Sequence, residues 1–273
     1  MAKAFSLASW NVEHFKGKAE RVKDIVQYPR DEAKNPDVFA IYEVEGKTVF
    51  DALVSEMPDY QFHITEGRQT QEILVGVKRN LTAFFTQRTE FKSGNAFLRP
   101  GALLTLNIDG HAYSILFLHT KSLPTPVGFG LRDDMSERAF KFKRVLDKAA
   151  GGKNKAQFIF LGDLNTMGLD YPFDRDITPD LELKRIDGRA SRNGMRRLVK
   201  NAPATFWNGP GSSLPPSDLD HVVVSKSLTF RSFTGGADVD VRGWPKEPTD
   251  QKKGQWINRF SDHALPFLEV QKV

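Results

Sequence analysis

One short stretch of the chain places two chemically able side chains at the end of an apolar run. The run QFIFL at 157–161 is short and aromatic-rich, which predicts a buried strand. Gly162 then permits a tight turn or a close approach to a ligand. Asp163 and Asn165 follow, and residues two apart in an extended segment point to one side, so both should face one pocket. A carboxylate accepts a proton or binds a hard cation, and a carboxamide donates to an anionic oxygen.

Further polar groups stand where other apolar runs end. These groups are Asn11, Glu43, His119, Asp220, Asp262 and His263. Each alone has a structural explanation, because Asp and Asn are common turn formers, a strand-end Glu can be a solvated carboxylate and a His can cap a strand. Strand ends at one edge of a sheet converge on a common rim, however, so together they predict one site. Oxygen ligands in a chain without cysteine favour magnesium or manganese.

The hydrophobic pattern predicts the elements that would position these groups. The first part alternates strands and helices, a run of strands between residues 60 and 118 follows, and residues 131–150 form the clearest amphipathic helix. Residues 167–217 are expected to be irregular and 234–259 loop-like. Other predicted elements are a helix at 18–26 and strands at 217–225, 227–233 and 267–270. Two packed sheets with helices outside, in a single domain over residues 1–273, fit this order.

Composition limits the classes of protein that the chain can belong to. Of 273 residues 40% are hydrophobic and 21 are Phe, which excludes a disordered chain. There is no cysteine, so disulfides and thiolate metal sites are excluded. No apolar run is long enough for a membrane span or resembles a signal peptide, and we expect a soluble, cytoplasmic protein. A net charge of +5 permits an anionic partner without naming one.

Six stretches, taken together, resemble the endonuclease/exonuclease/phosphatase superfamily, the metal-dependent phosphodiesterase fold of pancreatic-type deoxyribonuclease. They are SWNVEHF at 9–15, YEVEG at 42–46, LHTKS at 118–122, GDLNT at 162–166, SDLDHVVVS at 217–225 and SDHALP at 261–266. They occur in the family's order and span nearly the whole chain. The resemblance implies an α/β fold, a four-layered α/β sandwich of two packed, mainly antiparallel β-sheets flanked by helices.

The resemblance also implies roles for the residues at the predicted rim. Glu43 would be the principal carboxylate ligand of Mg2+ or Mn2+, Asp262 a second ligand, and Asn11 would lie beside the metal. Asp163 would orient or deprotonate the attacking water, and Asn165 would hold a non-bridging phosphate oxygen.

Two histidines complete the implied machinery. His263 would contact the scissile phosphate, oriented by Asp220, and His119 is a candidate general acid. A histidine held by a carboxylate is fixed in orientation, and its pKa is raised. The chain departs from the family at Tyr42, where many members have Gln, and at Glu45, where nucleases often carry Arg or Lys. An acidic residue at that place would repel a nearby phosphate.

A basic segment between the GDLN and LDH stretches offers a second kind of contact. Cations can hold phosphates and aromatic rings can stack on bases, whereas the alternative is a solvated basic helix face. The candidate substrate-binding residues are Arg99, Arg189, Arg192, Arg196, Arg197 and Trp207.

The leading hypothesis is a metal-dependent nuclease that hydrolyses phosphodiester bonds of DNA or RNA by metal-assisted water attack. Nucleic acid is then the expected partner, without membrane insertion and without an obligate protein partner. The second hypothesis is a small-molecule or lipid phosphoesterase, such as a phosphoinositide phosphatase or a sphingomyelinase-like enzyme. The third is an inactive relative that only binds nucleic acid or protein, which would have no need of Asp163, Asp220 and His263 together.

Overall fold

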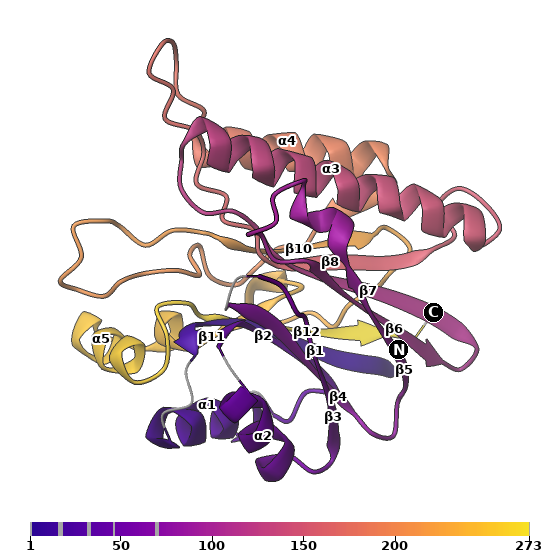
Figure 1. Ribbon diagram of the computed structural model, residues 1–273, viewed down its shortest axis with the longest axis horizontal. Coiled ribbons are helices and arrows are strands. Elements are labelled where there is room, and N and C mark those ends of the chain that lie inside the picture. Colours follow the sequence, from indigo (N-terminus) through magenta and orange to yellow (C-terminus); the bar gives the residue numbers. More distant parts are fainter. Residues whose placement is uncertain (1, 16–18, 32–33, 46, 69–70, 273) are drawn as a thin grey trace.

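The computed structural model describes residues 2–15, 19–31, 34–45, 47–68 and 71–272. Over these ranges two six-stranded sheets stack face to face, with helices outside them (Figure 1). Eight of the ten pairings between named strands are antiparallel, as the sequence predicts. None of the described helices combines the length and the apolar character that a membrane crossing needs. The single domain over 1–273 stays a prediction.

The first sheet is built around the parallel pair β1 and β2. Its strand order is β11 (Asp240–Arg242), β12 (Leu265–Gln271), β1 (Lys3–Phe15), β2 (Val38–Val44), β4 (Glu72–Lys78) and β3 (Tyr60–Ile64). Segments from the two ends of the chain are therefore neighbours, because β12 pairs with β1.

The second sheet is built around the parallel pair β7 and β8. Its strand order is β5 (Thr82–Arg88), β6 (Gly101–Ile108), β7 (His111–His119), β8 (Gln157–Asp163), β10 (Asp220–Ser225) and β9 (Met195–Arg197). Each sheet thus has one central parallel pair, and the carboxyl ends of parallel strands meet at one edge.

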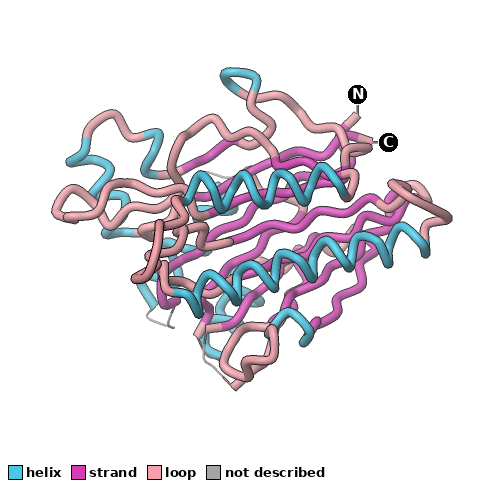
Figure 2. The backbone as a smooth tube through the Cα atoms, turned by 90° about the horizontal axis from the view of Figure 1, so that it is seen from above, coloured by secondary structure: helices cyan, strands magenta, loops and turns pink. Residues whose placement is uncertain are grey.

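Side chains that alternate along the strands fill three apolar layers. Leu7 and Leu161 lie in the layer between the sheets. Trp10 points outward, into a layer shared with α1 (Ala19–Asp31), α2 (Lys47–Glu56) and α5 (Asp250–Arg259). Phe160 points outward from the other sheet, toward α3 (Pro126–Ala149) and α4 (Pro179–Arg192). Figure 2 shows these two helices side by side, running roughly along the direction of the strands.

Helices α3 and α4 begin in the same way, each with a threonine as the capping residue and a proline as the first helical residue. The Thr125 side chain accepts a hydrogen bond from the Gly128 amide at 3.1 Å, and Thr178 accepts one from Leu181 at 3.3 Å. A capping hydroxyl and a proline in the first turn together favour a helix start at that position. Both starts follow the segments that leave β7 and β8, so the helix starts also anchor those segments.

Several segments differ from the sequence expectation. The range 167–217 contains α4 and β9, and 234–259 contains α5. The buried positions of α4 are Glu182, Ile186 and Ala190, and a charged residue in this stripe hides the apolar period. The expected strand at 227–233 is limited to an isolated bridge at Phe230. Helix α1 extends beyond the expected 18–26, and residue 18 lies outside the described ranges. Short 3-10 turns are η1 (Thr89–Lys92), η2 (Thr234–Gly236) and η3 (Trp244–Lys246).

Candidate active site

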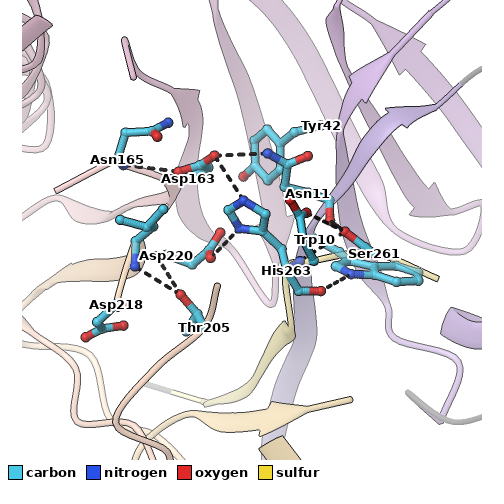
Figure 3. Close-up of polar contacts among 12 residues, drawn as sticks. Trp10, Asn11, Tyr42, Asp163, Asn165, Thr205, Asp218, Asp220, Ser261 and His263 are labelled. Carbon is cyan, nitrogen blue, oxygen red and sulfur yellow. Dashed lines mark hydrogen bonds and ion pairs between the residues drawn. The ribbon is translucent and has the colours of Figure 1, made fainter. Parts of the chain in front are cut away.

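The central strands of both sheets deliver polar residues to one edge of the sandwich. His119 and Asp163 are directly paired at the ends of β7 and β8, and Asp220 lies opposite Asp163 on antiparallel β10. Asn11 and Glu43 lie toward the ends of β1 and β2 in the facing sheet. Figure 3 shows the side chains of Asn11, Asp163, Asp220 and His263 turned toward one another.

Asp163 lies at the centre of the group and is almost fully buried. Asn11 Nδ2 donates to Asp163 Oδ2 at 2.9 Å, and Nε2 of His119 and of His263 lie 3.4 and 3.8 Å from the same oxygen. Burial, helped by the neighbouring carboxylates, raises the pKa of Asp163 to about 7. A carboxyl group that titrates near neutrality is suited to accept a proton during a reaction.

His263 and Asp220 form a buried ion pair next to Asp163. His263 Nδ1 lies 2.9 Å from Asp220 Oδ2. Burial alone would lower the pKa of His263, but the carboxylates of Asp220 and Asp163 outweigh burial and raise it to about 10. Trp10 Nε1 donates to the His263 carbonyl at 2.9 Å, and the Phe206 ring lies 4.9 Å from the imidazole. The imidazole is therefore charged at neutral pH and contacted by Asp220 and Phe206, while Trp10 fixes the backbone of the same residue.

A second group of carboxylates lies beside Asn11. Asn11 Nδ2 donates to Glu43 Oε1 at 3.1 Å, and the His14 amide donates to Glu43 Oε2 at 2.9 Å. Burial, with the charges of Glu13 and Glu43, raises the pKa of Asp262 to about 6. A carboxyl group whose pKa is raised by neighbouring carboxylates, as that of Asp262 is, gains from a nearby cation, which would relieve the repulsion.

The donor set fits a hard divalent cation. Its donors are carboxylate and amide oxygens, and the chain has no thiolate to offer. Asp163, Asp220 and His263 also each offer a ligand atom within 4.8 Å of one another. His263 is already hydrogen-bonded to Asp220 and positively charged, so this trio is poorly suited to bind a cation. Glu43 and Asp262 are better suited to bind the cation.

His119 differs from His263 in its charge state. Its Nε2 lies 3.7 Å from Glu43 Oε1, and its Nδ1 has no hydrogen-bond partner among the described residues. Burial lowers the pKa of His119 well below its ordinary value, and the charges of Arg99, His263 and Lys121 lower it further. The imidazole is therefore neutral at neutral pH.

Asn165 reaches the site by a turn rather than in the expected extended form. It lies beyond the end of β8 with a φ of 47°. Its amide N donates to Asp163 Oδ1 at 3.1 Å, and its Nδ2 donates to the Thr120 carbonyl at 3.2 Å. Left-handed backbone outside glycine is strained and concentrates at functional sites. The site contains three more such residues, Glu13, His14 and Glu43.

Gly162 allows a close packing contact within the protein, where the sequence suggested a tight turn or a close approach to a ligand. With a φ of 137°, a Cβ at this position would lie 2.1 Å from the Leu118 carbonyl and 2.6 Å from the Tyr42 hydroxyl. The Tyr42 hydroxyl lies 3.0 Å from that of Ser9, and both are buried. Tyr42 therefore forms the inner wall beneath the site, at the place where the sequence departs from the family pattern.

Four of the basic candidates lie in the layer of α4 and β9. Arg189 contacts Asp133 at 2.6 Å, Arg196 contacts Asp238 at 2.7 Å, and Arg197 contacts Asp187 at 2.8 Å. Arg192 is exposed and lines a hollow of about 370 Å³ at the carboxyl end of α3, with Arg144, Lys148 and Lys153. Within the described part of the chain, none of the four contacts the strand-end residues.

Arg99 and Trp207 do lie at the site. Glu43 and Asp163 are close enough to oppose the burial that lowers the pKa of Arg99, and Arg99 Nε donates to the Gln71 carbonyl at 3.0 Å. The Trp207 amide donates to the Asp262 carbonyl at 2.9 Å. These two are therefore the members of the basic and aromatic set that remain candidates for substrate contact.

Two hydroxyl residues of the site were missed by sequence reasoning. Ser261 Oγ donates to the Asn11 carbonyl at 2.8 Å and accepts from the His263 amide at 3.1 Å. Thr205 Oγ1 accepts from the Asp220 amide at 3.0 Å (Figure 3). Ser261 belongs to the SDHALP stretch, which could have flagged it, whereas nothing in the local sequence marks Thr205.

Comparison with known structures finds the same fold in other proteins. Truncated TDP2 of Caenorhabditis elegans matches with a TM-score of 0.67 at 16% identity, over 98% of this chain and 97% of that one. TDP2 of D. rerio complexed with single-strand DNA product matches with 0.64 at 16% identity, over 98% of each chain. The mannosyl-6-phosphatase Bt3783 of Bacteroides thetaiotaomicron matches with a TM-score of 0.59 at 17% identity, over 97% of this chain and 98% of that one.

A family model extends this likeness from the fold to the sequence. No curated protein matches the chain. The model of the Endonuclease/Exonuclease/phosphatase family matches residues 8–263, which includes every strand-end residue described above. That range also contains five of the six stretches from which the resemblance was inferred, and it ends within the sixth, at His263. The chain therefore belongs to the endonuclease/exonuclease/phosphatase family of divalent-metal-dependent phosphoesterases.

Proposed function

We propose that the protein is a magnesium- or manganese-dependent phosphodiesterase that hydrolyses DNA or RNA. One observation carries the proposal. Asp163, a buried carboxyl with a pKa of about 7, lies next to His263, a buried imidazolium with a pKa of about 10. Where the environment moves the pKa values of two neighbouring groups apart, one group can act as the proton acceptor and the other as the proton donor. The fold match to TDP2 complexed with single-strand DNA product supports nucleic acid as the substrate.

The two groups account for both proton transfers of hydrolysis. Asp163 takes a proton from water as the water oxygen bonds to phosphorus. His263 gives its Nε2 proton to the leaving oxygen as the phosphorus–oxygen bond breaks, and Asp220 stabilises the imidazolium beforehand. Asn165 Nδ2 uses one hydrogen on the Thr120 carbonyl, so the second is available for a non-bridging phosphate oxygen.

Glu43, Asp262 and Asn11 would hold the cation. When bound, the metal stabilises negative charge on the phosphoryl oxygens. Asn11 has a further role of its own, because its Nδ2 donates to both Glu43 and Asp163 and so fixes the spacing between the metal side and the proton acceptor.

His119 receives a different role from the expected general acid. A neutral imidazole is a poor proton donor to a leaving group at neutral pH, and burial keeps His119 neutral. We assign to it the orientation of Asp163 through Nε2, at 3.4 Å. We assign the role of general acid to His263.

The test is hydrolysis of single- and double-stranded DNA, RNA, an abasic duplex and a chromogenic phosphodiester, with and without Mg2+ or Mn2+. Metal-dependent cleavage of a nucleic acid, lost in Asp163→Ala, establishes the nuclease. Turnover of none of these substrates, with stoichiometric binding only, would refute it and favour the binding-only alternative. Cytoplasmic localisation stays a prediction.

A small phosphoester is the second candidate substrate, and two observations favour it. Three of the basic candidates are committed to ion pairs within the protein, and Glu45, beside His14 at 3.1 Å, adds negative charge at the rim. The fold match to a mannosyl-6-phosphatase points the same way. Salt distinguishes the two, because binding of a polyanion weakens steeply with ionic strength and binding of a small ester does not.

A further inference from the structure

A buried arginine outside the strand-end group forms hydrogen bonds with both segments that follow the active-site strands. Arg132 lies near the start of α3 and is 2% exposed. Its Nε and Nη2 donate to the two carboxylate oxygens of Glu182 on α4, at 2.8 and 3.1 Å. Its Nη1 donates to the carbonyls of Lys121 and Leu123, at 3.1 and 2.8 Å, and its Nη2 also donates to Gly168 at 2.7 Å.

The three carbonyls belong to the segments that continue the active-site strands. Lys121 and Leu123 follow His119 at the end of β7, and Gly168 follows Asn165 after β8. Glu182 binds the second segment too, because its Oε2 accepts from the Gly168 amide at 2.7 Å. The guanidinium of Arg132 and the carboxylate of Glu182 therefore bind both segments.

Direct bonds between the segments carry this constraint to the site. The Thr120 amide donates to the Asp163 carbonyl at 2.9 Å, and Asn165 Nδ2 donates to the Thr120 carbonyl at 3.2 Å. Farther out, the Asp170 amide donates to the Pro124 carbonyl at 2.7 Å. A shift of either segment would move the Asn165 amide relative to Asp163.

Stability is a weak explanation for such a pair. Desolvating two charges costs about as much as their attraction returns, and an apolar pair of similar volume is often as stable. A planar guanidinium that donates to several fixed acceptors instead specifies one geometry. Helix α3 carries another buried pair, Lys143 and Asp147 at 2.5 Å, which caps the Ala156 amide at the opposite end of the helix.

We propose that Arg132, with Glu182, is a positioning residue for catalysis that fixes Asn165 and His119 against Asp163. The inference rests on the proposed phosphodiesterase function. Its defining consequence is a loss of kcat with little change in KM, because a misplacement of about 1 Å at reacting groups can cost about 100-fold in rate.

The experiment compares two double variants that each replace a buried ion pair by apolar residues. Arg132→Met with Glu182→Leu removes the pair behind the site without leaving an unpaired charge. Lys143→Met with Asp147→Leu removes the pair at the far end of α3 and controls for loss of stability. We expect kcat to fall about 10- to 100-fold in the first, with KM within about twofold, and to be unchanged in the second. Arg132→Lys should restore part of the kcat lost in Arg132→Met.

Amide hydrogen exchange supplies a readout that does not depend on turnover. Exchange should rise at 120–125 and 164–170 in the Arg132 and Glu182 double variant and not in the control. Wild-type kcat and exchange in that variant, or an equal loss of kcat in both, would overturn the proposal. If the wild type hydrolyses no substrate, the proposed function fails. The amide hydrogen exchange of the two segments then decides by itself whether Arg132 positions them.

Discussion

Carboxylates lie near both ends of strand β2, and those at the two ends behave in opposite ways. Before its first residue, Asp37 accepts from Lys3, from the amide and hydroxyl of Ser6, and from Lys78, at 2.7 to 3.1 Å. These donors outweigh burial and lower the pKa of Asp37 to about 2. Beyond its other end lies Asp163, where burial and neighbouring carboxylates raise the pKa to about 7.

The difference teaches how structural and reactive charge can be told apart. Burial raises the pKa of both carboxyl groups, so burial alone does not mark a site. Two things differ. Asp37 is only partly buried and is paired with Lys3 and Lys78, whereas Asp163 is almost fully buried and has Asp220 and Glu43 beside it as well as the imidazolium of His263. At the active-site edge Asp220 Oδ1 also has no partner among the described residues. Repulsion between carboxylates that the folded protein does not neutralise favours the binding of a ligand or a proton at that place.

The largest expected effect is a loss of turnover when Asp163 is replaced. Asp163→Asn should lower kcat by about 10³-fold, since it removes the proton acceptor. The melting temperature should hold or rise, because a buried carboxylate is removed from among like charges. Arg189→Ala, in the paired layer of α4, should keep kcat because its partner is Asp133. Steady-state rates and thermal melts of the three proteins provide the measurement, and an active Asp163→Asn enzyme would contradict the assignment.

The next effect is on metal affinity. Removing divalent ions with EDTA should abolish turnover, and Mn2+ should raise the melting temperature because the ion binds the folded state and relieves repulsion. Glu43→Gln should weaken Mn2+ binding about 10- to 100-fold, measured by calorimetric titration. Asp37→Asn, the matched change at the paired end of β2, should leave Mn2+ affinity unchanged. Equal affinities in wild type and Glu43→Gln would place the ion elsewhere.

The sequence predicted the fold and the strand-end residues better than it predicted their partners. Apolar runs ending in Asn11, Glu43, His119 and Asp163 were readable because local pattern and chain order were enough. The expected role of the basic segment depended on which acids face it. Asp133 comes from α3 and Asp238 from a distant loop, and no local pattern shows either pairing. Helix α4 was missed for a related reason, because its buried stripe includes a charged residue whose partner is Arg132.

A smaller effect is the pH dependence of the rate. Asp163 must be ionised to accept a proton, so kcat/KM should rise through about pH 7. His263 must be protonated to donate, so the rate should fall as pH passes about 10. A bound cation would move the acidic limb lower. Asp220→Asn removes the largest charge that raises the pKa of His263, so its basic limb should move to lower pH. A basic limb that stays in place in this variant would separate the donor from His263.

The smallest effect is on stability at the paired end. The folded-state pKa of Asp37 is about 2 against an ordinary value of 3.8. Its pairing therefore stabilises the protein fully above about pH 4, and this contribution disappears as pH falls through about 2. Discounted for solvent screening, it amounts to about 1 to 2 kcal/mol. Urea unfolding of wild type and Asp37→Asn should differ by this amount at pH 6 and converge toward pH 2. A constant difference would mean that the lost hydrogen bonds, rather than the charge, stabilise this end of the strand.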